Sequence, residues 1–404
     1  MDLVACFFCR KSLPHDPFSP LCPDCGEPMF VVPPEGSGPR TVRMDRALPL
    51  ERYADFLPLG VYDPRLSLGE GETPFVALDK LGARLGIRGL FAKNEAQNPT
   101  GSFKDRGTAL AVQKALALGF GKIGTVSTGN MAASTAAYGA RAGLETWILL
   151  KEGTSRSSVQ AAAIYGPVLV TVRGDYGLLF YKSLEIGRKL GIYFMNSIDP
   201  FRVEGYKVTG FEIWTQLGRR APGAIFVPLS SGGHLIGLMR AFEDLERAGL
   251  VSRYPTFVGV QAAGCAPLAR AFESDRPRYE RWESVRTLAH AISNPAPPAG
   301  NAALKLIKDR GGLIVSVPDE AMLAAQASLA SSEGLFCQPE SAVALAGMLR
   351  LREEGRLAAD SECVLVLTGS GLKSPHALDS QPLKVEEAGL GDLENRLSSL
   401  ARPR

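Results

Sequence analysis

NPTGSFKDRG, residues 98–107, places a lysine at the point where a turn gives way to a helix. Gly101 and Ser102 predict the turn and the N-cap of that helix, and Asp105 then falls in its first turn. Apolar residues spaced as on one helix face continue the pattern to residue 118. The dipole at this end of a helix favours anions. Lys104 is therefore either an ordinary solvent-exposed side chain or a residue with a catalytic or ligand-binding role.

Short apolar runs alternate with helical stretches along most of the chain. The predicted strands cover residues 90–95, 123–128, 146–150, 168–172, 192–196, 224–229, 256–261, 313–317 and 363–368. The predicted helices include residues 130–143, 176–190, 205–217, 234–248, 319–332 and 340–354. Nearly continuous apolar strands separated by helices are typical of parallel sheets with both faces covered. We predict an α/β protein with two three-layer, parallel-sheet domains and a ligand in the cleft between them.

Changes in composition set the predicted domain limits. Residues 1–35 form a small cysteine-containing unit, and VVPPEGSGPR at its end reads as a linker. We predict that residues 36–95 are linker and the start of a large domain, and residues 96–204 a smaller α/β domain. Residues 205–404 then complete the large domain and add a polar tail, in which GDLENRLSSLA has the spacing of a short amphipathic helix.

Four of the seven cysteines form two CxxC pairs separated by twelve residues. These are Cys6, Cys9, Cys22 and Cys25. Two such pairs supply the four thiolates that structural zinc prefers, and they leave no open position for catalysis. A redox dithiol is the alternative, but one CxxC pair would be enough for it. We therefore predict a structural zinc ribbon at the N-terminus.

Composition narrows the possible partners. The net charge is +3, too small to predict a nucleic-acid or anionic-membrane partner. The segment between the cysteine pairs carries two basic residues and no basic cluster. No apolar run is long enough to cross a bilayer, and the first residues do not resemble a signal peptide. These features predict a cytoplasmic protein that binds neither nucleic acid nor membrane.

Polar residues collect where several predicted strands end. Ser127, Thr128, Gly129 and Asn130 follow one strand and begin a helix. SSGGH, residues 230–234, follows another strand, and its backbone N–H groups at a helix N-terminus favour an anion. Thr368 ends a third strand. Pyridoxal phosphate needs a lysine for an imine, an anion site, and partners for its ring hydroxyl and ring nitrogen.

Several motifs occur in an order that resembles one enzyme family. They are GEGETPF, NPTGSFKDRG, STGN, NSIDPFRVEG, GVQAAGCAPL and LTGSGLK. Over nearly its whole length the chain resembles the threonine synthases, which are pyridoxal-phosphate enzymes of fold type II, the tryptophan synthase β-like group. Several members of that family also carry an N-terminal cysteine ribbon. The resemblance implies pyridoxal phosphate as cofactor, a homodimer, and a small amino-acid substrate that is phosphorylated.

The resemblance also implies a role for each candidate site residue. Lys104 would form the imine with the cofactor and then move protons at the substrate carbons. Asn130 would bind the ring hydroxyl and Thr368 would face the ring nitrogen, while the phosphate would be held by Ser230, Ser231, Gly232, Gly233 and His234. The substrate carboxylate would be received by Ser127, Thr128 and Gly129. The leaving phosphate would be bound by Asn196, Ser197 and Arg202, with Arg156 as a nearby cation.

The sequence departs from the family pattern at positions where substrate would be recognised. Met131 follows Asn130 where the family has a threonine, and SSGGH replaces a loop that often reads GNAGN. QPESA, residues 338–342, replaces an EPASA-like stretch, and TGSGLK replaces TGHGLK. None of these changes removes the cofactor chemistry.

The resulting expectation is a carbon–oxygen lyase of the threonine synthase type. It would convert O-phospho-L-homoserine and water to L-threonine and phosphate by β,γ-replacement. The alternative keeps the cofactor and changes the substrate, with β-elimination or β-replacement on serine, threonine or a phosphorylated hydroxy-amino acid. A third possibility, from another class, is a pyridoxal-phosphate-binding or zinc-ribbon interaction protein without turnover.

Overall fold

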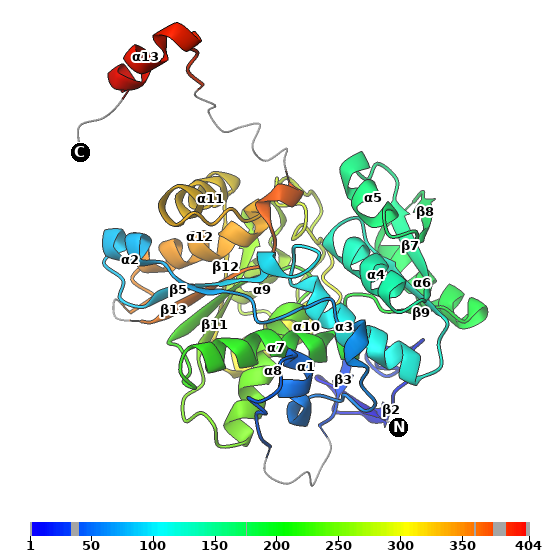
Figure 1. The fold of residues 1–404 in the computed structure, drawn as a ribbon. Coiled ribbons are helices and arrows are strands. Elements are labelled where there is room, and N and C mark those ends of the chain that lie inside the picture. The colour runs from blue at the N-terminus through cyan, green and yellow to red at the C-terminus, as the bar shows by residue number, and fades with distance from the viewer. Residues whose placement is uncertain (1, 34–39, 175, 359–360, 375–384, 401–404) are drawn as a thin grey trace.

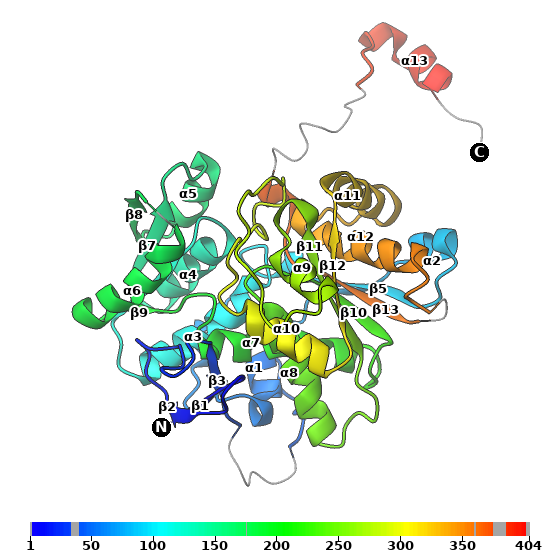
Figure 2. The ribbon, with the colours of Figure 1, turned by 180° about the vertical axis from the view of Figure 1, so that it is seen from behind.

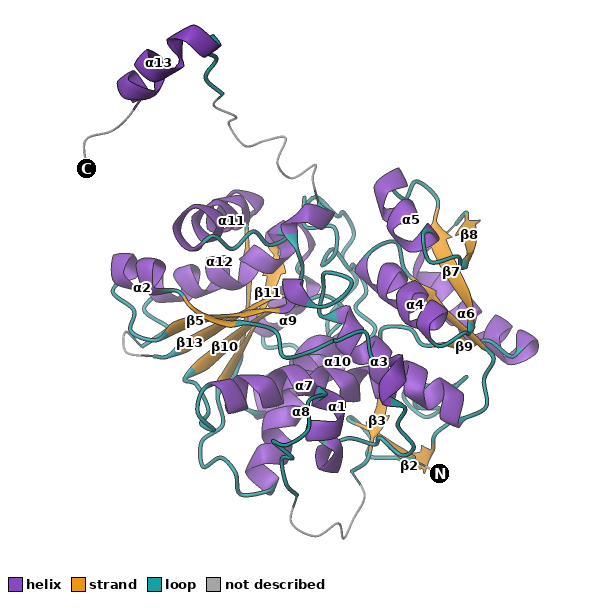
Figure 3. Ribbon diagram, viewed as in Figure 1, coloured by secondary structure: helices purple, strands orange, loops and turns teal. Residues whose placement is uncertain are grey.

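The computed structural model describes residues 2–33, 40–174, 176–358, 361–374 and 385–400. Three sheets organise the chain, and helices pack around the two larger ones (Figure 1, Figure 3). None of the helices in these ranges is both long and apolar enough to span a membrane.

The largest sheet has six strands in the order β12, β11, β10, β13, β5 and β4. Their bounds are Leu313–Val317, Thr256–Ala262, Ala224–Pro228, Cys363–Leu367, Leu90–Asn94 and Phe75–Ala77. Every neighbouring pair is parallel except β4 and β5. Because β13 lies between β10 and β5, strands from opposite ends of the sequence are paired at the centre of the sheet.

Both faces of this sheet are covered, because alternate residues of each strand enter different cores. Ile225 and Val227 of β10 join a core with α3 (Lys104–Ala117), α7 (Pro200–Gln216), α8 (Gly233–Arg247) and α10 (Gly300–Asp309). Phe226, between them, joins a core with α2 (Asp79–Leu85), α11 (Asp319–Glu333) and α12 (Pro339–Glu353). The two groups of helices lie on opposite sides of the sheet in Figure 1.

The second sheet has four strands, all parallel, in the order β8, β7, β6 and β9. Their bounds are Val168–Val172, Glu145–Lys151, Lys122–Val126 and Tyr193–Phe194. Ile148 of β7 packs with α4 (Asn130–Arg141) and α5 (Arg156–Ala163) on one face. The neighbouring Leu149 packs with α6 (Tyr176–Leu190) on the other. Figure 2 shows this smaller three-layer unit from behind, beside the larger one.

The N-terminal ribbon is an antiparallel sheet in the order β2, β1 and β3. Its strands are Ser12–Pro14, Leu3–Cys6 and Met29–Val31. The small core of the ribbon includes Phe201, which belongs to the first turn of α7. Arg240 of α8 donates to the carbonyl of Val31 (2.7 Å), and Asn301 of α10 donates to Glu27 (2.9 Å). The ribbon is therefore packed against helices of the large domain.

The predicted fold class and all nine predicted strands are confirmed. The predicted start of the helix at residue 205 was late, because α7 already begins at Pro200. Asp199 caps it by accepting from the backbone N–H groups of Phe201 and Arg202, and proline suits the first helical position. The α-helices α1 (Pro49–Arg52), α2, α5, α9 (Pro267–Glu273) and α10 were not predicted from the sequence, whereas the predicted tail helix forms as α13 (Leu393–Leu400).

Candidate active site

The turn that carries Lys104 is built as predicted, but its cap differs. Gly101 has a φ of +76°, as the predicted turn requires. Phe103, not Ser102, is the N-cap, and it makes no side-chain cap because its phenyl ring has no hydrogen-bond acceptor. Ser102 is instead held in a bridge to Gly369, so the predicted N-cap was wrong. Asp105 stabilises the turn by accepting from the backbone N–H and the hydroxyl of Thr100 (2.7 and 2.6 Å).

Lys104 is the first residue of α3, and its amine lies against aromatic rings. The amine is 4.2 Å from the ring centre of Phe103 and 6.0 Å from that of Tyr206. Burial, with a smaller contribution from the charge of Arg202, lowers the pKa of Lys104 to about 7. A lysine at this pKa is neutral in a large fraction of molecules near pH 7 and is then a nucleophile. The structure favours a chemical role for Lys104 over simple exposure.

The turn from β10 into α8 passes through residues 230–233, and two of these positions, Gly232 and Gly233, have no room for a side chain. Gly232 has a φ of +98°, and a Cβ there would lie 2.7 Å from the carbonyl oxygen of Ala299. A Cβ on Gly233 would lie 2.9 Å from the carbonyl oxygen of Ser197. The backbone N–H groups of this loop stand at the N-terminus of a 15-residue helix. Such a loop is a suitable cradle for an anion.

His234 occupies the second position of α8 and is 6% exposed. Its ring stacks on Phe103 at 3.9 Å between centres and meets Tyr206 edge-on at 5.4 Å. Among the described residues neither ring nitrogen has a hydrogen-bond partner. Burial, then the charges of Lys104 and Arg106, hold the pKa of His234 well below its usual range, so the ring is neutral. Buried unpaired nitrogens are costly, and a bound ligand would explain them.

Asn130 and Thr368 also lie where β-strands end, on different domains. Asn130 is the first residue of α4, and its Nδ2 donates to Oε1 of Gln338 (2.7 Å). The hydroxyl of Thr368 lies 2.9 Å from that of Ser341. Before α4, the hydroxyl of Ser127 accepts from the backbone N–H of Gly129 (3.3 Å), and Thr128 lies between them.

The residues predicted to bind the leaving phosphate are less accessible. Asn196 is 2% exposed and bonds to the N–H of Val126 and the hydroxyl of Ser183 (2.9 and 3.0 Å). Arg202 is fully buried. Its guanidinium donates to the carbonyl of Met195 (2.6 Å) and to the hydroxyls of Thr108 (2.8 Å) and Thr135 (2.6 Å).

Two further predicted substrate residues differ in their surroundings. Ser197 is partly exposed beside the glycine loop, and Arg156 is exposed at the start of α5. A cavity of about 500 Å³ opens between α5 and the segment before Lys104. Residues 96–101 line it on one side, Ala133, Ala161, Ile164 and Tyr165 on another, and Ser370 and Lys373 complete it. Residues of both domains therefore line this cavity, which lies next to the candidate site.

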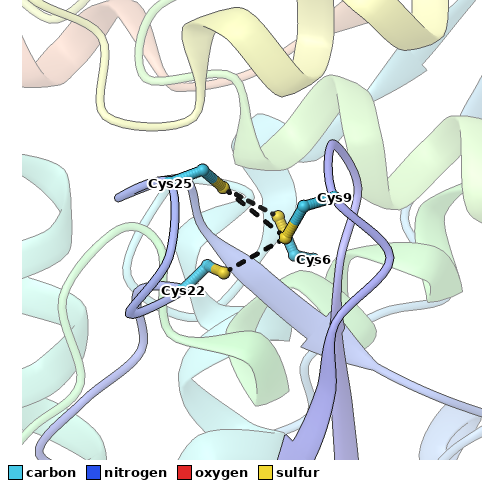
Figure 4. Close-up of side chains that lie close together, drawn as sticks. All are labelled: Cys6, Cys9, Cys22 and Cys25. Atoms are coloured by element: carbon cyan, nitrogen blue, oxygen red, sulfur yellow. Dashed lines mark hydrogen bonds between the residues drawn. The ribbon is translucent and has the colours of Figure 1, made fainter.

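The four N-terminal cysteines converge at one point, as Figure 4 shows. The Sγ–Sγ distance is 3.4 Å for Cys6 and Cys25 and also 3.4 Å for Cys9 and Cys22. It is 3.8 Å for Cys9 and Cys25. All four sulfurs lie within 4.8 Å of one another. Tetrahedral zinc with Zn–S bonds of about 2.3 Å places its ligands about 3.8 Å apart. The cluster has the dimensions and donor set of such a site.

Comparisons with known proteins agree with this geometry. A family model described as "Pyridoxal-phosphate dependent enzyme" matches residues 66–369. Threonine synthase from Methanocaldococcus jannaschii is 37% identical over 345 residues, which cover 84% of this chain and 85% of that protein. The chain belongs to the threonine synthase family of pyridoxal-phosphate-dependent enzymes. Another family member, threonine synthase from Mycobacterium tuberculosis, is 35% identical over 337 residues, covering 82% of this chain and 90% of that one.

Two solved enzyme structures share the fold of this chain. Threonine deaminase isoform 2 from Solanum lycopersicum superposes with a TM-score of 0.65 at 21% identity, over 78% of this chain and 89% of that one. Diaminopropionate ammonia lyase from Escherichia coli gives a TM-score of 0.67 at 16% identity, over 78% and 88% of the two chains. At these identities the likeness shows the fold alone.

The residues present fit pyridoxal phosphate. The family requires an amine that can be neutral, a cradle for a phosphate and polar partners for the ring. Lys104 provides the amine. The glycine loop provides the cradle, because a Cβ on Gly232 or Gly233 would lie too close to a neighbouring backbone carbonyl oxygen. The unpaired nitrogens of buried His234 lie beside both.

Gly232→Ala is expected to weaken cofactor binding and to destabilise the protein. The new Cβ would meet the carbonyl of Ala299 in a backbone conformation that alanine already disfavours. We expect a cofactor dissociation constant at least tenfold higher, measured by fluorescence titration. Gly249→Ala is the matched control, since its φ is +69° and nothing lies within 4 Å of its Cβ. Equal affinity in both variants would contradict the proposed role of the loop.

Proposed function

We propose that this enzyme converts O-phospho-L-homoserine and water to L-threonine and phosphate by β,γ-replacement. The observation that carries the proposal is the position of Lys104, whose low-pKa amine lies near His234 and the glycine loop at the start of α8, in a chain with threonine synthase relatives. When bound, pyridoxal phosphate supplies an electron sink that stabilises negative charge at the substrate α-carbon.

The protein's own residues divide the work around that cofactor. The amine of Lys104 takes protons from the substrate α- and β-carbons and returns protons to the γ-carbon, which becomes the methyl group, and to the α-carbon, while water supplies the hydroxyl at the β-carbon. Ser230, Ser231, Gly232 and Gly233 hold the cofactor phosphate through backbone N–H groups, and neutral His234 donates to it. Asn130 binds the ring oxygen, and the hydroxyl of Thr368 faces the ring nitrogen without imposing a charge there.

Substrate recognition requires two anion sites. We place the α-carboxylate on Ser127, Thr128 and Gly129 at the N-terminus of α4, where backbone N–H groups favour an anion. The leaving phosphate would be bound by Asn196, Ser197 and Arg202, with Arg156 as an exposed cation. Arg202 is fully buried and already donates to three protein acceptors, so a phosphate would have to reach the remaining N–H groups of its guanidinium. A buried phosphate left without such a partner would be costly.

The direct test is to incubate the holoenzyme with O-phospho-L-homoserine and to measure threonine and released phosphate together. Equal amounts of both products, absent from a Lys104→Ala blank, are expected. Phosphate without threonine would contradict the β,γ-replacement. Turnover of serine or threonine to a keto acid, with no action on the phosphorylated substrate, would show instead that Met131 and its neighbours select a non-phosphorylated substrate.

We also propose that the four cysteines of the ribbon bind one structural zinc ion, and we expect one zinc per chain by metal analysis. Cys22→Ser should abolish the zinc and lower the melting temperature, because the ribbon packs on α7 through Phe201. Cys265→Ser is the matched control, since that cysteine is also buried but lies outside the cluster. Equal zinc content in the two variants would exclude the site.

The resemblance further supports a homodimer that works in the cytoplasm. Light scattering of the purified holoenzyme tests the first part of this proposal. A mass of one 43.2 kDa chain at micromolar concentration would contradict it.

A further inference from the structure

The side chain of Gln338 connects the two domains at the candidate site. It precedes α12 of the large domain and is 6% exposed. Its Oε1 accepts from Nδ2 of Asn130 in the small domain (2.7 Å), and its Nε2 donates to the hydroxyl of Ser374 (2.9 Å). Both ends of the amide are therefore fixed, and one of them holds a residue proposed to bind the cofactor ring.

The same segment also reaches Thr368, the other proposed ring contact. The backbone N–H of Gln338 donates to the carbonyl of Gly369 (2.9 Å), and the N–H of Gly369 donates to the hydroxyl of Ser341 (3.0 Å). That hydroxyl is 2.9 Å from the hydroxyl of Thr368. A continuous chain of hydrogen bonds thus runs from Asn130 to Thr368 through residues 338–341.

The side chain of Gln338 is packed closely against the backbone of Gly369. A Cβ on Gly369 would overlap its Oε1 and would lie 3.4 Å from Nδ2 of Asn130. Gly369 is thus a place of close approach, at which the glutamine amide lies directly over the backbone. Contacts with Asn130, Ser374 and Gly369 together favour the position in which its carbonyl faces Asn130.

The chemistry of the pair restricts what Asn130 can offer to a ligand. The amide nitrogen of Asn130 carries two hydrogens. Gln338 accepts one of them, and the second is left to donate to the ring oxygen of the cofactor. The acceptor is a neutral amide where a carboxylate would add a negative charge beside that oxygen.

We infer that Gln338 is a positioning residue that orients the amide of Asn130 toward the cofactor ring and keeps the surroundings of the ring oxygen uncharged. The inference rests on the proposed placement of the ring oxygen at Asn130. It assigns to Gln338 a role that is separate from holding the fold together. A purely structural glutamine would not alter the ionisation of the bound cofactor.

The test compares Gln338→Glu and Gln338→Met as holoenzymes, with the visible absorbance of the cofactor followed as a function of pH. Gln338→Glu keeps the shape and the acceptor, and the hydroxyl of Ser374 can turn to donate to the new carboxylate. Its negative charge should raise the pKa of the cofactor band by about one unit, since an opposite charge stabilises the protonated chromophore. Gln338→Met removes the acceptor and should raise the cofactor dissociation constant about tenfold.

Gln113 provides the matched control. It is also buried, and both ends of its amide bond to the backbone of Asp63 (3.1 and 2.8 Å) in a part of α3 remote from Lys104. Gln113→Glu and Gln113→Met should reduce stability and leave the absorbance titration and the cofactor affinity of the holoenzyme unchanged. Gln338 variants that behave like the Gln113 variants would overturn the inference.

Asn130→Ala separates this inference from the proposed function. If it changes the absorbance titration and the Gln338 variants do not, Asn130 binds the ring oxygen and Gln338 has no positioning role. If Asn130→Ala leaves the titration and the affinity unchanged, the placement of the cofactor ring is itself wrong.

Discussion

Lys104→Ala is expected to lower kcat for threonine formation by roughly 10³-fold or more, because proton transfer at the α-, β- and γ-carbons of the substrate depends on this one amine. The variant should also lack the visible absorbance of the lysine-bound cofactor. Lys104→Arg should be equally inactive, since a guanidinium does not lose its proton in proteins. The measurements are steady-state kinetics with O-phospho-L-homoserine and an absorbance spectrum after addition of pyridoxal phosphate.

Lys114→Ala is the control for this loss. It changes the same residue type in the same helix, but its amine pairs with Asp2 of the ribbon and takes no part in the site. It should keep kcat within about twofold, with at most a small loss of stability. Substantial activity in Lys104→Ala would show that another group carries out the proton transfers.

Glu212→Gln is expected to lower the free energy of unfolding by about 3–5 kcal/mol, because it leaves buried cations without their counter-charge. Glu212 is fully buried on α7 and accepts from Lys93 (2.6 Å) and from both terminal nitrogens of Arg106 (2.7 Å each). Arg106 lies two residues after Lys104 and also pairs with Glu95 (2.5 Å). Urea unfolding of the wild type and the variant measures the loss.

The pH dependence of this effect follows from the ionisation of the same group. Burial acts to raise the pKa of Glu212, but the charges of Arg106 and Lys93 outweigh it and lower the pKa to about 2 from 4.5. A depressed carboxyl pKa stabilises the fold above pH 4.5 and loses that contribution as the pH falls toward 2. The stability difference between wild type and Glu212→Gln should therefore shrink over that range.

Glu362→Gln is the control for the Glu212 variant, because it removes a carboxylate that pairs with a cation at the surface. Glu362 pairs with Arg220 (2.6 Å), whose side chain is 57% exposed. Its replacement should cost less than about 1 kcal/mol. Equal losses in the Glu362 and Glu212 variants would show that the buried network adds nothing beyond an ordinary ion pair.

The sequence predicted most of the scaffold because its strands are apolar on both faces. All five residues of β10, for example, are buried, so its apolar run needs no structural context to be recognised. The helices α2 and α10 were missed because they are short, seven and ten residues, and helices of that length form mainly through packing. The extra turn at the start of α7 depended on Asp199 as a cap.

The sequence predicted individual residues and loops of the candidate site better than the hydrogen bonds that connect them. Lys104 and the glycine loop stand in local patterns that can be read from a few residues. Gln338 was noticed only as a departure from a family pattern, because its contact with Asn130 joins residues 208 positions apart. The burial of Arg202 also depends on three partners from separate segments, which no local pattern reveals.

The position of β13 at the centre of the large sheet has a consequence for biosynthesis. Residues 363–367 pair with residues 90–94, so β5 remains unpaired on that edge while most of the chain is still being translated. Pairings this distant in sequence form slowly, and an exposed strand edge is prone to aggregation. Thr368 directly follows β13 and is therefore also translated late. We therefore expect the β5 edge to be exposed to aggregation until β13 is made, and the pocket that includes Thr368 to be completed only at that late stage.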